Sequence, residues 1–297
     1  MDFMAIQKFL VERGIELPES AATWAQRLQL STYWELAGLA TIIVFVGGNL
    51  KALPLVHSLR LLPSLRRLLT PRLFGRRGVQ SRNKTTSNDT ATAVAVAHPS
   101  LFCHNTLTSR AILLDLDVNI HKSNSTFFAD ADISRAALLT SMLSEALASR
   151  NALFVLAGTQ CKFLREIRPL QKYAVASQIL TWTDKAFYVV TYFVSPRRSD
   201  AAAVCSLRGG PDAVLKDDKL RKKVFAIMVS KYVFKAGRAT VAPVDVFGAA
   251  GLLLSSDDVV EVNVKGGENK NKTGVLGAEE VQRVVKEGME FVRDCML

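Results

Sequence analysis

The sequence predicts an α+β domain in which an antiparallel sheet curls around one long helix. Two observations support this prediction. A segment rich in alanine and leucine, from about Ser125 to Ala148, has helical periodicity and carries apolar residues over most of its surface. Several segments rich in β-branched and aromatic residues follow it, separated by short breaks. One long helix after a first strand and ahead of an antiparallel meander is the order expected when the sheet encloses the helix.

Length and composition predict one main domain with extensions. The chain has 297 residues, 49% of them hydrophobic, which suffices to bury one core and excludes a disordered protein. We expect an N-terminal region at residues 1–97, the main domain at 98–240 and a C-terminal extension at 241–297. The extension has valines and a methionine at helical spacing from Gly277 to Cys295, which predicts an amphipathic closing helix.

The net charge of +11 is concentrated in one block of the N-terminal region. Between Glu35 and Asp89 there are nine lysines and arginines and no acidic residue, so the rest of the chain carries only +2. The block continues into a polar stretch between Arg76 and Val96 that we interpret as a basic linker. The basic run lacks interleaved aromatic residues and a recognisable nucleic-acid-binding module, so we expect no nucleic acid as a partner.

An apolar segment at about residues 36–57 precedes most of the arginines and predicts a membrane anchor. Leu36 to Leu50 is uncharged and mostly apolar, which is borderline against the roughly 20 residues that span a bilayer. Tyr33 and Trp34 stand where an interfacial aromatic belt would lie. A transmembrane or interfacial helix is therefore expected, with the main domain on the cytosolic or an equivalent side because the positive charges follow it. The alternative is a buried core helix beside a solvated basic linker.

The join between the first strand and the long helix is where we expect the chemistry. Leu107 to Leu116 has the composition of a strand, and it ends beside two carboxylates, one of them Asp117. A short polar turn then leads to Asn124, a good N-cap residue at the start of the helix. Charged helix residues such as Asp130 and Arg135 are placed mostly away from the apolar face.

Four further strands are expected from composition and turn signals. Their ranges are Leu153 to Leu164, Tyr173 to Trp182, Lys185 to Val194 and Val224 to Phe234. The break at Thr183-Asp184 is short enough for a tight antiparallel hairpin between the second and third of them. The polar stretch at about residues 195–223 is expected to be an insertion between the last two.

Three segments resemble hotdog-fold thioesterases. Residues 117–124, DVNIHKSN, are similar to the D-x-x-G-H-x-N-N signature that precedes the central helix in the 4-hydroxybenzoyl-CoA thioesterase type. Residues 179–189, ILTWTDKAFYV, closely resemble L-L-G-W-D-x-R-A-F-Y-L, the third-to-fourth strand hairpin of the thioesterase superfamily member six group. Residues 163–170, FLREIRPL, are similar to the same group's approach to the preceding strand. The resemblance covers roughly Thr106 to Ala236.

This resemblance implies a hotdog fold, a homodimer and an acyl-CoA or other acyl thioester substrate bound near the helix start at the subunit interface. Carried over to this sequence, Asp117 takes the position of the catalytic carboxylate and would activate water. His121 would orient Asp117 or the thioester, and backbone N–H groups around Asn124 would stabilise the oxyanion. No cofactor is implied. The cysteines and histidines show no spacing typical of metal ligands, so no metal is expected.

Two positions depart from the signature. The glycine before the histidine is Ile120 here, and the first asparagine of the pair is Ser123. Glycine lets a backbone approach a ligand closely, so a branched residue would narrow the oxyanion site. Asp117 and Asn124 are also compatible with capping the turn and the helix, and His121 with a buried histidine bonded to a carbonyl group.

Two alternative functions follow from the same segment. The first is a non-catalytic, membrane-tethered hotdog module that binds an acyl chain or a protein. The second is an enoyl-CoA hydratase-like enzyme, because residues 117–121 also resemble the D-x-N-P-x-H motif of hotdog hydratases, although the proline is absent and the spacing is one residue shorter.

Overall fold

The computed structural model describes residues 19–53, 55–74, 96–97, 99–206, 210–254 and 278–296. The chain forms two compact units that divide between Leu53 and Pro54. The first contains helix α2 (Glu19–Gly48) and a 3₁₀ turn (Leu50–Ala52), and the second contains every other described element. The predicted linker lies almost wholly outside the described residues, so the predicted region boundaries stay predictions.

Helix α2 contains most of the predicted membrane anchor but does not provide a spanning helix. The helix ends at Gly48, and the separate 3₁₀ turn that follows means that the apolar residues beyond Lys51 do not lengthen it. Across the described residues, no helix combines the length and the apolar character needed to cross a bilayer. The predicted transmembrane helix is therefore not supported.

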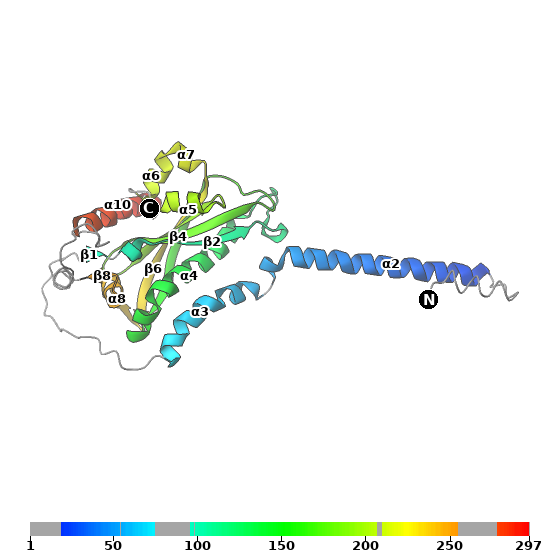
Figure 1. Cartoon of the computed structure of the whole chain (residues 1–297), viewed down its shortest axis with the longest axis horizontal. Helices are drawn as coiled ribbons and strands as arrows, with labels where there is room; N and C mark the ends of the chain where they lie inside the picture. Colours follow the sequence, from blue (N-terminus) through cyan, green and yellow to red (C-terminus); the bar gives the residue numbers. More distant parts are fainter. Residues whose placement is uncertain are drawn as a thin grey trace, which may run out of the picture. The chain divides into compact units, whose positions relative to one another are not determined.

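An antiparallel sheet of six strands forms the centre of the second unit (Figure 1). The strand order is β2-β4-β5-β6-β3, with β7 paired to β6. The bounds are β2 Asn105–Arg110, β3 Leu153–Phe163, β4 Lys172–Trp182, β5 Phe187–Val194, β6 Val224–Ala236 and β7 Ala239–Val241. The predicted tight hairpin is confirmed, because β4 pairs with β5 and the Thr183 N–H donates to the Ala186 carbonyl oxygen at 2.7 Å.

Helix α4 (Asn124–Ser149) packs along one face of this sheet (Figure 1). Leucines on its inward side meet the inward side chains of three strands in one core: Leu139, Leu143, Leu147, Ile179, Phe187, Val189 and Phe234. Nearer the start of the helix, the Phe127 ring packs edge-on against Phe193 of β5 and Phe163 of β3. The predicted hotdog arrangement, a curled antiparallel sheet with a long helix against its inner face, is confirmed.

Two charged residues of α4 are buried, contrary to the prediction. Asp130 and Arg135 are 2% and 1% exposed. Arg135 donates to Ser230 Oγ at 2.7 Å and to Asp132 Oδ1 at 2.5 Å. A buried charge is tolerated when it is paired and hydrogen-bonded. Those partners lie partly on a distant strand, so helical periodicity alone could not reveal them.

The first strand is shorter than predicted. β2 ends at Arg110. This residue pairs with Lys172, which is the first residue of the antiparallel partner strand β4, so the ladder between the two strands stops there. The chain then turns through a 3₁₀ segment (Leu113–Asp115), in which Asp115 Oδ2 accepts the Ile112 N–H at 3.4 Å. The predicted extended run to Leu116 is therefore wrong, and the turn redirects the chain toward α4.

A second layer of helices covers the sheet face opposite α4 (Figure 1). Three helices lie between β5 and β6, namely α5 (Arg198–Cys205), α6 (Gly210–Lys216) and α7 (Asp218–Arg221). Helix α10 (Ala278–Met296) forms in the segment predicted to be amphipathic and packs on β4. It approaches closely through Gly288, where a Cβ would lie 2.9 Å from the Thr181 Cβ. Every residue of β5 is buried as a result.

The remaining elements extend the core around α4. Helix α3 (Val56–Phe74) packs against α4 (Figure 1), and helix α8 (Pro243–Ala249) inserts Phe247 against Trp182 and Phe234. Two short strands, β1 (Val96–Ala97) and β8 (Leu253–Leu254), pair with each other.

Candidate active site

The loop between β2 and α4 closes on itself just before the helix. Leu116 and Lys122 form an isolated antiparallel bridge. Inside this bridge, the Asp117 N–H donates to the His121 carbonyl oxygen at 2.9 Å, and the Ile120 N–H donates to the Asp117 carbonyl oxygen at 3.0 Å. These bonds hold residues 117–121 as a compact tip at the start of α4.

Asp117 lies at this tip with its carboxylate partly open to solvent. Its side chain is 29% exposed, and Oδ1 accepts the Asn119 N–H at 2.9 Å. The same oxygen lies 3.4 Å from His121 Nδ1. The carboxylate thus has the turn-capping contact that its residue type favours, and it also faces the imidazole.

His121 lies between two carboxylates. Its Nδ1 faces Asp117, and its Nε2 lies 3.7 Å from Glu166 Oε2. The Lys122 N–H donates to the Ile167 carbonyl oxygen at 2.9 Å, and this bond brings the segment before β4 alongside the tip. The side chain of His121 is 31% exposed, so the interpretation of a buried histidine is wrong.

Asn124 is the first residue of α4 and is exposed. Ser123 is the N-cap residue but makes no side-chain capping bond, and the Thr126 N–H donates to the Ser123 carbonyl oxygen at 3.0 Å. The amides of Asn124 and Ser125 precede the first intrahelical bonds, so their N–H groups point out of the helix end. Asp117 and His121 lie together, whereas Asn124 makes no described hydrogen bond to either.

Ile120 adopts a left-handed backbone conformation, with φ of 60°. This region suits glycine and is unfavourable for a β-branched residue. The side chain is 69% exposed, so it projects away from the core. Glycine at this place in the family signature is therefore explained by the backbone angle.

A buried charged cluster lies directly beneath the tip. Lys122 is 2% exposed, and its Nζ lies 3.0 Å from Asp130 Oδ2 and 3.6 Å from Asp115 Oδ2. It also donates to Thr126 Oγ1 at 2.8 Å and lies over the rings of Phe127 and Tyr173. Asp115, Lys122, Asp130 and Tyr173 are called the buried cluster below.

Tyr173 completes the buried cluster from β4. Its hydroxyl donates a short hydrogen bond to Asp130 Oδ2. Burial, followed by the negative charge of Asp130, raises the pKa of Tyr173 far above its ordinary value. The tyrosine therefore stays neutral and acts as a hydrogen-bond donor. Arg60 of α3 reaches the same carboxylate, with Nη1 3.4 Å from Asp130 Oδ1.

Sequence reasoning missed Glu166 and the roles of the buried cluster. One signal was available, because Thr126 and Asp130 are four residues apart and so share a side of the helix, which Lys122 precedes by two residues. The other partners come from β4 and from the segment before it, and their proximity depends on the sheet register.

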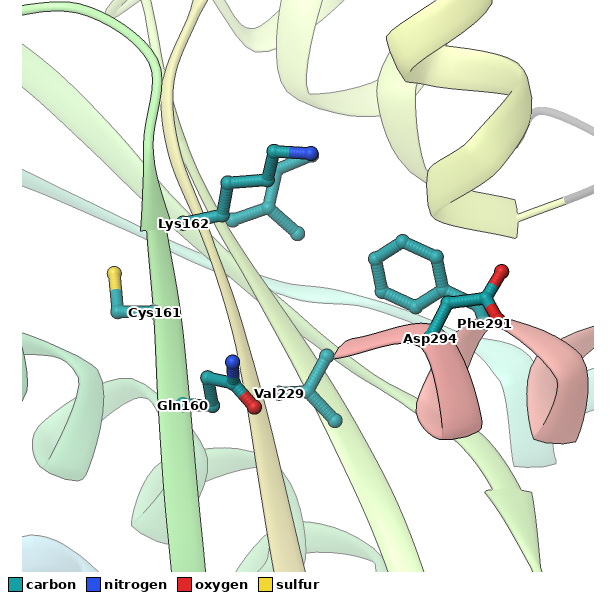
Figure 2. Close-up of a pocket in the computed structure, with 7 residues that line it drawn as sticks. Gln160, Cys161, Lys162, Val229, Phe291 and Asp294 are labelled. Carbon is teal, nitrogen blue, oxygen red and sulfur yellow. The ribbon is translucent and has the colours of Figure 1, made fainter. Parts of the chain in front are cut away.

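A pocket of about 280 Å³ lies elsewhere, on the opposite face of the sheet. Figure 2 shows Lys162 on the same side of β3 as Phe291 and Asp294 of α10, whereas Cys161 points to the other side. No predicted site residue lines it. Burial raises the pKa of the Cys161 thiol to about 12, so this thiol stays protonated at neutral pH and is not a nucleophile.

The described residues contain no group of three or more His, Cys, Asp or Glu side chains arranged to hold a metal ion. The polar groups at the tip comprise two carboxylates, one imidazole and the amides of a helix start. With the sheet curled around α4, they define a hotdog-fold protein with a polar site at the start of its central helix.

Comparison with known proteins identifies the family. Residues 113–224 match the family described as the thioesterase-like superfamily. The thioesterase poxG of Penicillium oxalicum is 36% identical over 218 residues, which cover 66% of this chain and 72% of the relative. The probable thioesterase atnL of Emericella nidulans is 32% identical over 200 residues, covering 60% and 62%. The chain belongs to the thioesterase-like superfamily.

More distant similarities are of two kinds. Protein THEM6 of Xenopus laevis is 33% identical over 114 residues, which cover 36% of this chain and 55% of the relative. The crystal structure of a 1,4-dihydroxy-2-naphthoyl-CoA thioesterase from Synechocystis aligns with 50% of this chain and 95% of its own, at 12% identity and a TM-score of 0.36. The predicted resemblance to hotdog thioesterases, including the member six group, is confirmed.

Proposed function

We propose that this protein hydrolyses acyl-CoA thioesters at the tip formed by residues 117–121 and the start of α4. The observation that carries the proposal is the Asp117 carboxylate, partly exposed and 3.4 Å from His121 Nδ1, directly before the central helix. Its membership of the thioesterase-like superfamily supports a thioester as the substrate.

Asp117 acts as the general base in this proposal. Its Oδ1 is engaged by the Asn119 N–H, while Oδ2 has no hydrogen-bond partner among the described residues and is available to a water molecule. The water oxygen attacks the thioester carbonyl carbon as its proton passes to Asp117. The carbon–sulfur bond then breaks, the proton passes to the departing sulfur, and a free acid and a thiol result.

The amides at the start of α4 stabilise the negative charge that develops on the carbonyl oxygen. The N–H groups of Asn124 and Ser125 point out of the helix end, where the helix dipole also favours negative charge. Preorganised donors of this kind contribute more in the transition state than in the ground state.

His121 is a positioning residue in this proposal. It lies between Asp117 and Glu166, so it can hold the Asp117 carboxylate in one orientation. Its own orientation depends on Glu166, whose segment is bonded to the tip through the Ile167 carbonyl oxygen. Removing the side chain of His121 or of Glu166 is expected to reduce turnover less than removing that of Asp117.

The proposal is tested with an Asp117→Asn variant. Asparagine can still accept the Asn119 N–H but cannot take a proton from water, so kcat/KM should fall by about 10²- to 10⁴-fold while the fold is retained. Release of free thiol from acyl-CoA esters of several chain lengths measures the rate. An Asp184→Asn variant, which changes an exposed acid of the β4–β5 hairpin, is the matched control and should keep its rate.

Two outcomes would contradict the proposal. If Asp117→Asn hydrolyses as fast as the control, Asp117 is not the base. If the unsubstituted protein releases no thiol from any ester yet binds acyl-CoA, the alternative of a non-catalytic acyl-binding module is correct.

We also propose that two copies of the chain associate through the edge strand β3. Among the described strands, β3 pairs with β6 alone, and Leu153, Val155, Leu156 and Phe163 of β3 are exposed. An open apolar edge of this kind is a template for pairing with another chain. A Leu156→Glu variant should shift the mass in solution from dimer to monomer, whereas Val244→Glu on α8 should not. A monomeric unsubstituted protein would refute the dimer.

A further inference from the structure

Helix α3 carries a row of exposed leucines that lies mostly on the side facing away from α4, although Leu65 at its edge also lines a small cavity with Ala136 and Thr140 of α4. Leu59, Leu62, Leu65, Leu69 and Leu73 recur every three or four residues and are 38–70% exposed. These five residues are called the leucine stripe. Isolated apolar residues on a surface are ordinary, but a continuous apolar row marks an interaction surface.

The direction of the leucine stripe is set by the packing of α3. Its other side carries Ser64, which is 6% exposed, and Leu68, which packs into the core beside α4. Arg60 pairs with Asp130, and Arg72 Nη2 donates to the Ala152 carbonyl oxygen. Because these contacts occupy the inward side, the leucines cannot turn into the core without breaking them.

Positive charge lies along the same exposed surface. Arg66 falls within the row of leucines and Arg67 lies on the flank of the helix next to Ser64, and both are exposed. Neither makes an ion pair or side-chain hydrogen bond within the described part of the chain. The sequence between Glu35 and Asp89 contains no acidic residue that would neutralise them. An apolar stripe with arginines and no acids is the pattern of a helix that lies in the interface of an anionic bilayer.

We propose that α3 binds an anionic lipid surface through the leucine stripe, with Arg66 and Arg67 contacting phosphate headgroups. The helix lies in the plane of the surface, which requires no spanning segment. Leucine side chains enter the boundary between headgroups and acyl chains, and each arginine adds attraction to the negative leaflet. Because α3 packs against α4, this binding would hold the site proposed at the start of α4 close to the bilayer.

Vesicle binding by the full chain tests this. Phosphatidylcholine vesicles with and without phosphatidylserine are sedimented with the protein, and the bound fraction gives a partition coefficient. Binding should need phosphatidylserine and should weaken with added salt. The Arg66→Gln/Arg67→Gln variant should lose about 25-fold in partitioning, about five-fold per arginine. The Leu62→Gln/Leu69→Gln variant should lose about ten-fold or more.

Two matched controls separate this surface from general effects. Arg238→Gln/Arg293→Gln removes the same charge from exposed positions elsewhere, and Val244→Gln removes an exposed apolar residue of α8. Both should bind like the unsubstituted protein. All variants retain α2, so any binding by its apolar run is common to them. Thermal unfolding should be unchanged, because the substituted residues face outward.

Three results would overturn the proposal. The first is equal partitioning of the stripe variants and the controls. The second is binding to phosphatidylcholine alone that is as strong as binding to anionic vesicles. The third is unchanged vesicle binding with a lower mass in solution for Leu62→Gln/Leu69→Gln, which would assign the stripe to contact between copies of this chain.

Discussion

His121 and Lys122 are neighbours in the chain but lie in opposite environments. His121 is about one-third exposed between two partly exposed carboxylates, whereas Lys122 is fully enclosed between Asp115 and Asp130. Both residues have acidic partners at similar distances. The difference in burial gives the two residues different roles. An exposed ion pair can exchange protons with substrate and solvent, whereas an enclosed ion pair holds the surrounding backbone in one conformation.

The largest loss of stability is expected from Lys122→Met, which removes the enclosed charge. The substitution removes the enclosed ammonium that lies between two buried carboxylates, and the free energy of unfolding should fall by about 3–5 kcal/mol. Urea denaturation measures it. Lys185→Met, at an exposed position of the β4–β5 hairpin, should change stability by less than about 0.5 kcal/mol. Equal effects at the two lysines would mean that the buried cluster does not support the fold.

A smaller effect is expected from Tyr173→Phe, which removes only the hydroxyl bonded to Asp130. A hydrogen bond to a charged group contributes about 1.5–3 kcal/mol, so the free energy of unfolding should fall by that amount. Tyr192 is the matched control, because its buried hydroxyl has no hydrogen-bond partner among the described residues. Tyr192→Phe should be neutral or stabilising in the same urea titration. A stable Tyr173→Phe protein would show that Lys122 and Arg60 satisfy Asp130 without the tyrosine.

Ile120→Gly is expected to stabilise the folded protein by relieving strain in the exposed tip. A β-branched residue at φ of 60° costs about 1–2 kcal/mol, partly offset by the greater freedom of glycine in the unfolded chain, so a net gain of about 1 kcal/mol is expected. Val118→Gly, two residues away and without a positive φ, should instead lose stability. The difference in melting temperature between the two glycine variants is the measurement. A loss in both would mean that the tip relaxes around Ile120.

The smallest effect is expected at an ion pair whose cation is half exposed. Lys223 Nζ donates to Asp200 Oδ1 at 2.7 Å and Ser195 donates to its other oxygen, which together lower the pKa of Asp200. A lowered pKa adds stability above the ordinary pKa of aspartate, and this is lost as the pH falls through the folded value. Asp200→Asn should therefore cost about 0.5 kcal/mol at neutral pH and nothing in strong acid. Urea denaturation at several pH values measures this. If the loss of stability were the same at every pH, it would come from packing and not from the charge of Asp200.

The sequence predicted the elements that local patterns determine. The long helix at Asn124–Ser149, four strands after it and the hairpin at Thr183 follow from periodicity and turn chemistry. The motif also predicted where Asp117 and His121 lie relative to the helix. These features depend on neighbours within a few residues, which a sequence displays directly.

Features that depend on contacts between distant segments were missed. Asp130 is buried because Lys122, Tyr173 and Arg60 surround it, and Glu166 reaches His121 through a bond from Lys122 to Ile167. The second layer of helices is likewise set by the outward side chains of β4 and β5. The membrane-spanning helix was over-predicted because apolar residues were added across the end of α2 at Gly48.

The bridge between Leu116 and Lys122 separates the tip from the core that supports it. Side chains inside the bridge that point into solvent, such as Val118, can change without disturbing that core, provided that the number of residues stays the same. A single deletion there would move Lys122 out of register with its acids. Related chains are therefore expected to keep the length of this tip even where its solvent-exposed positions differ.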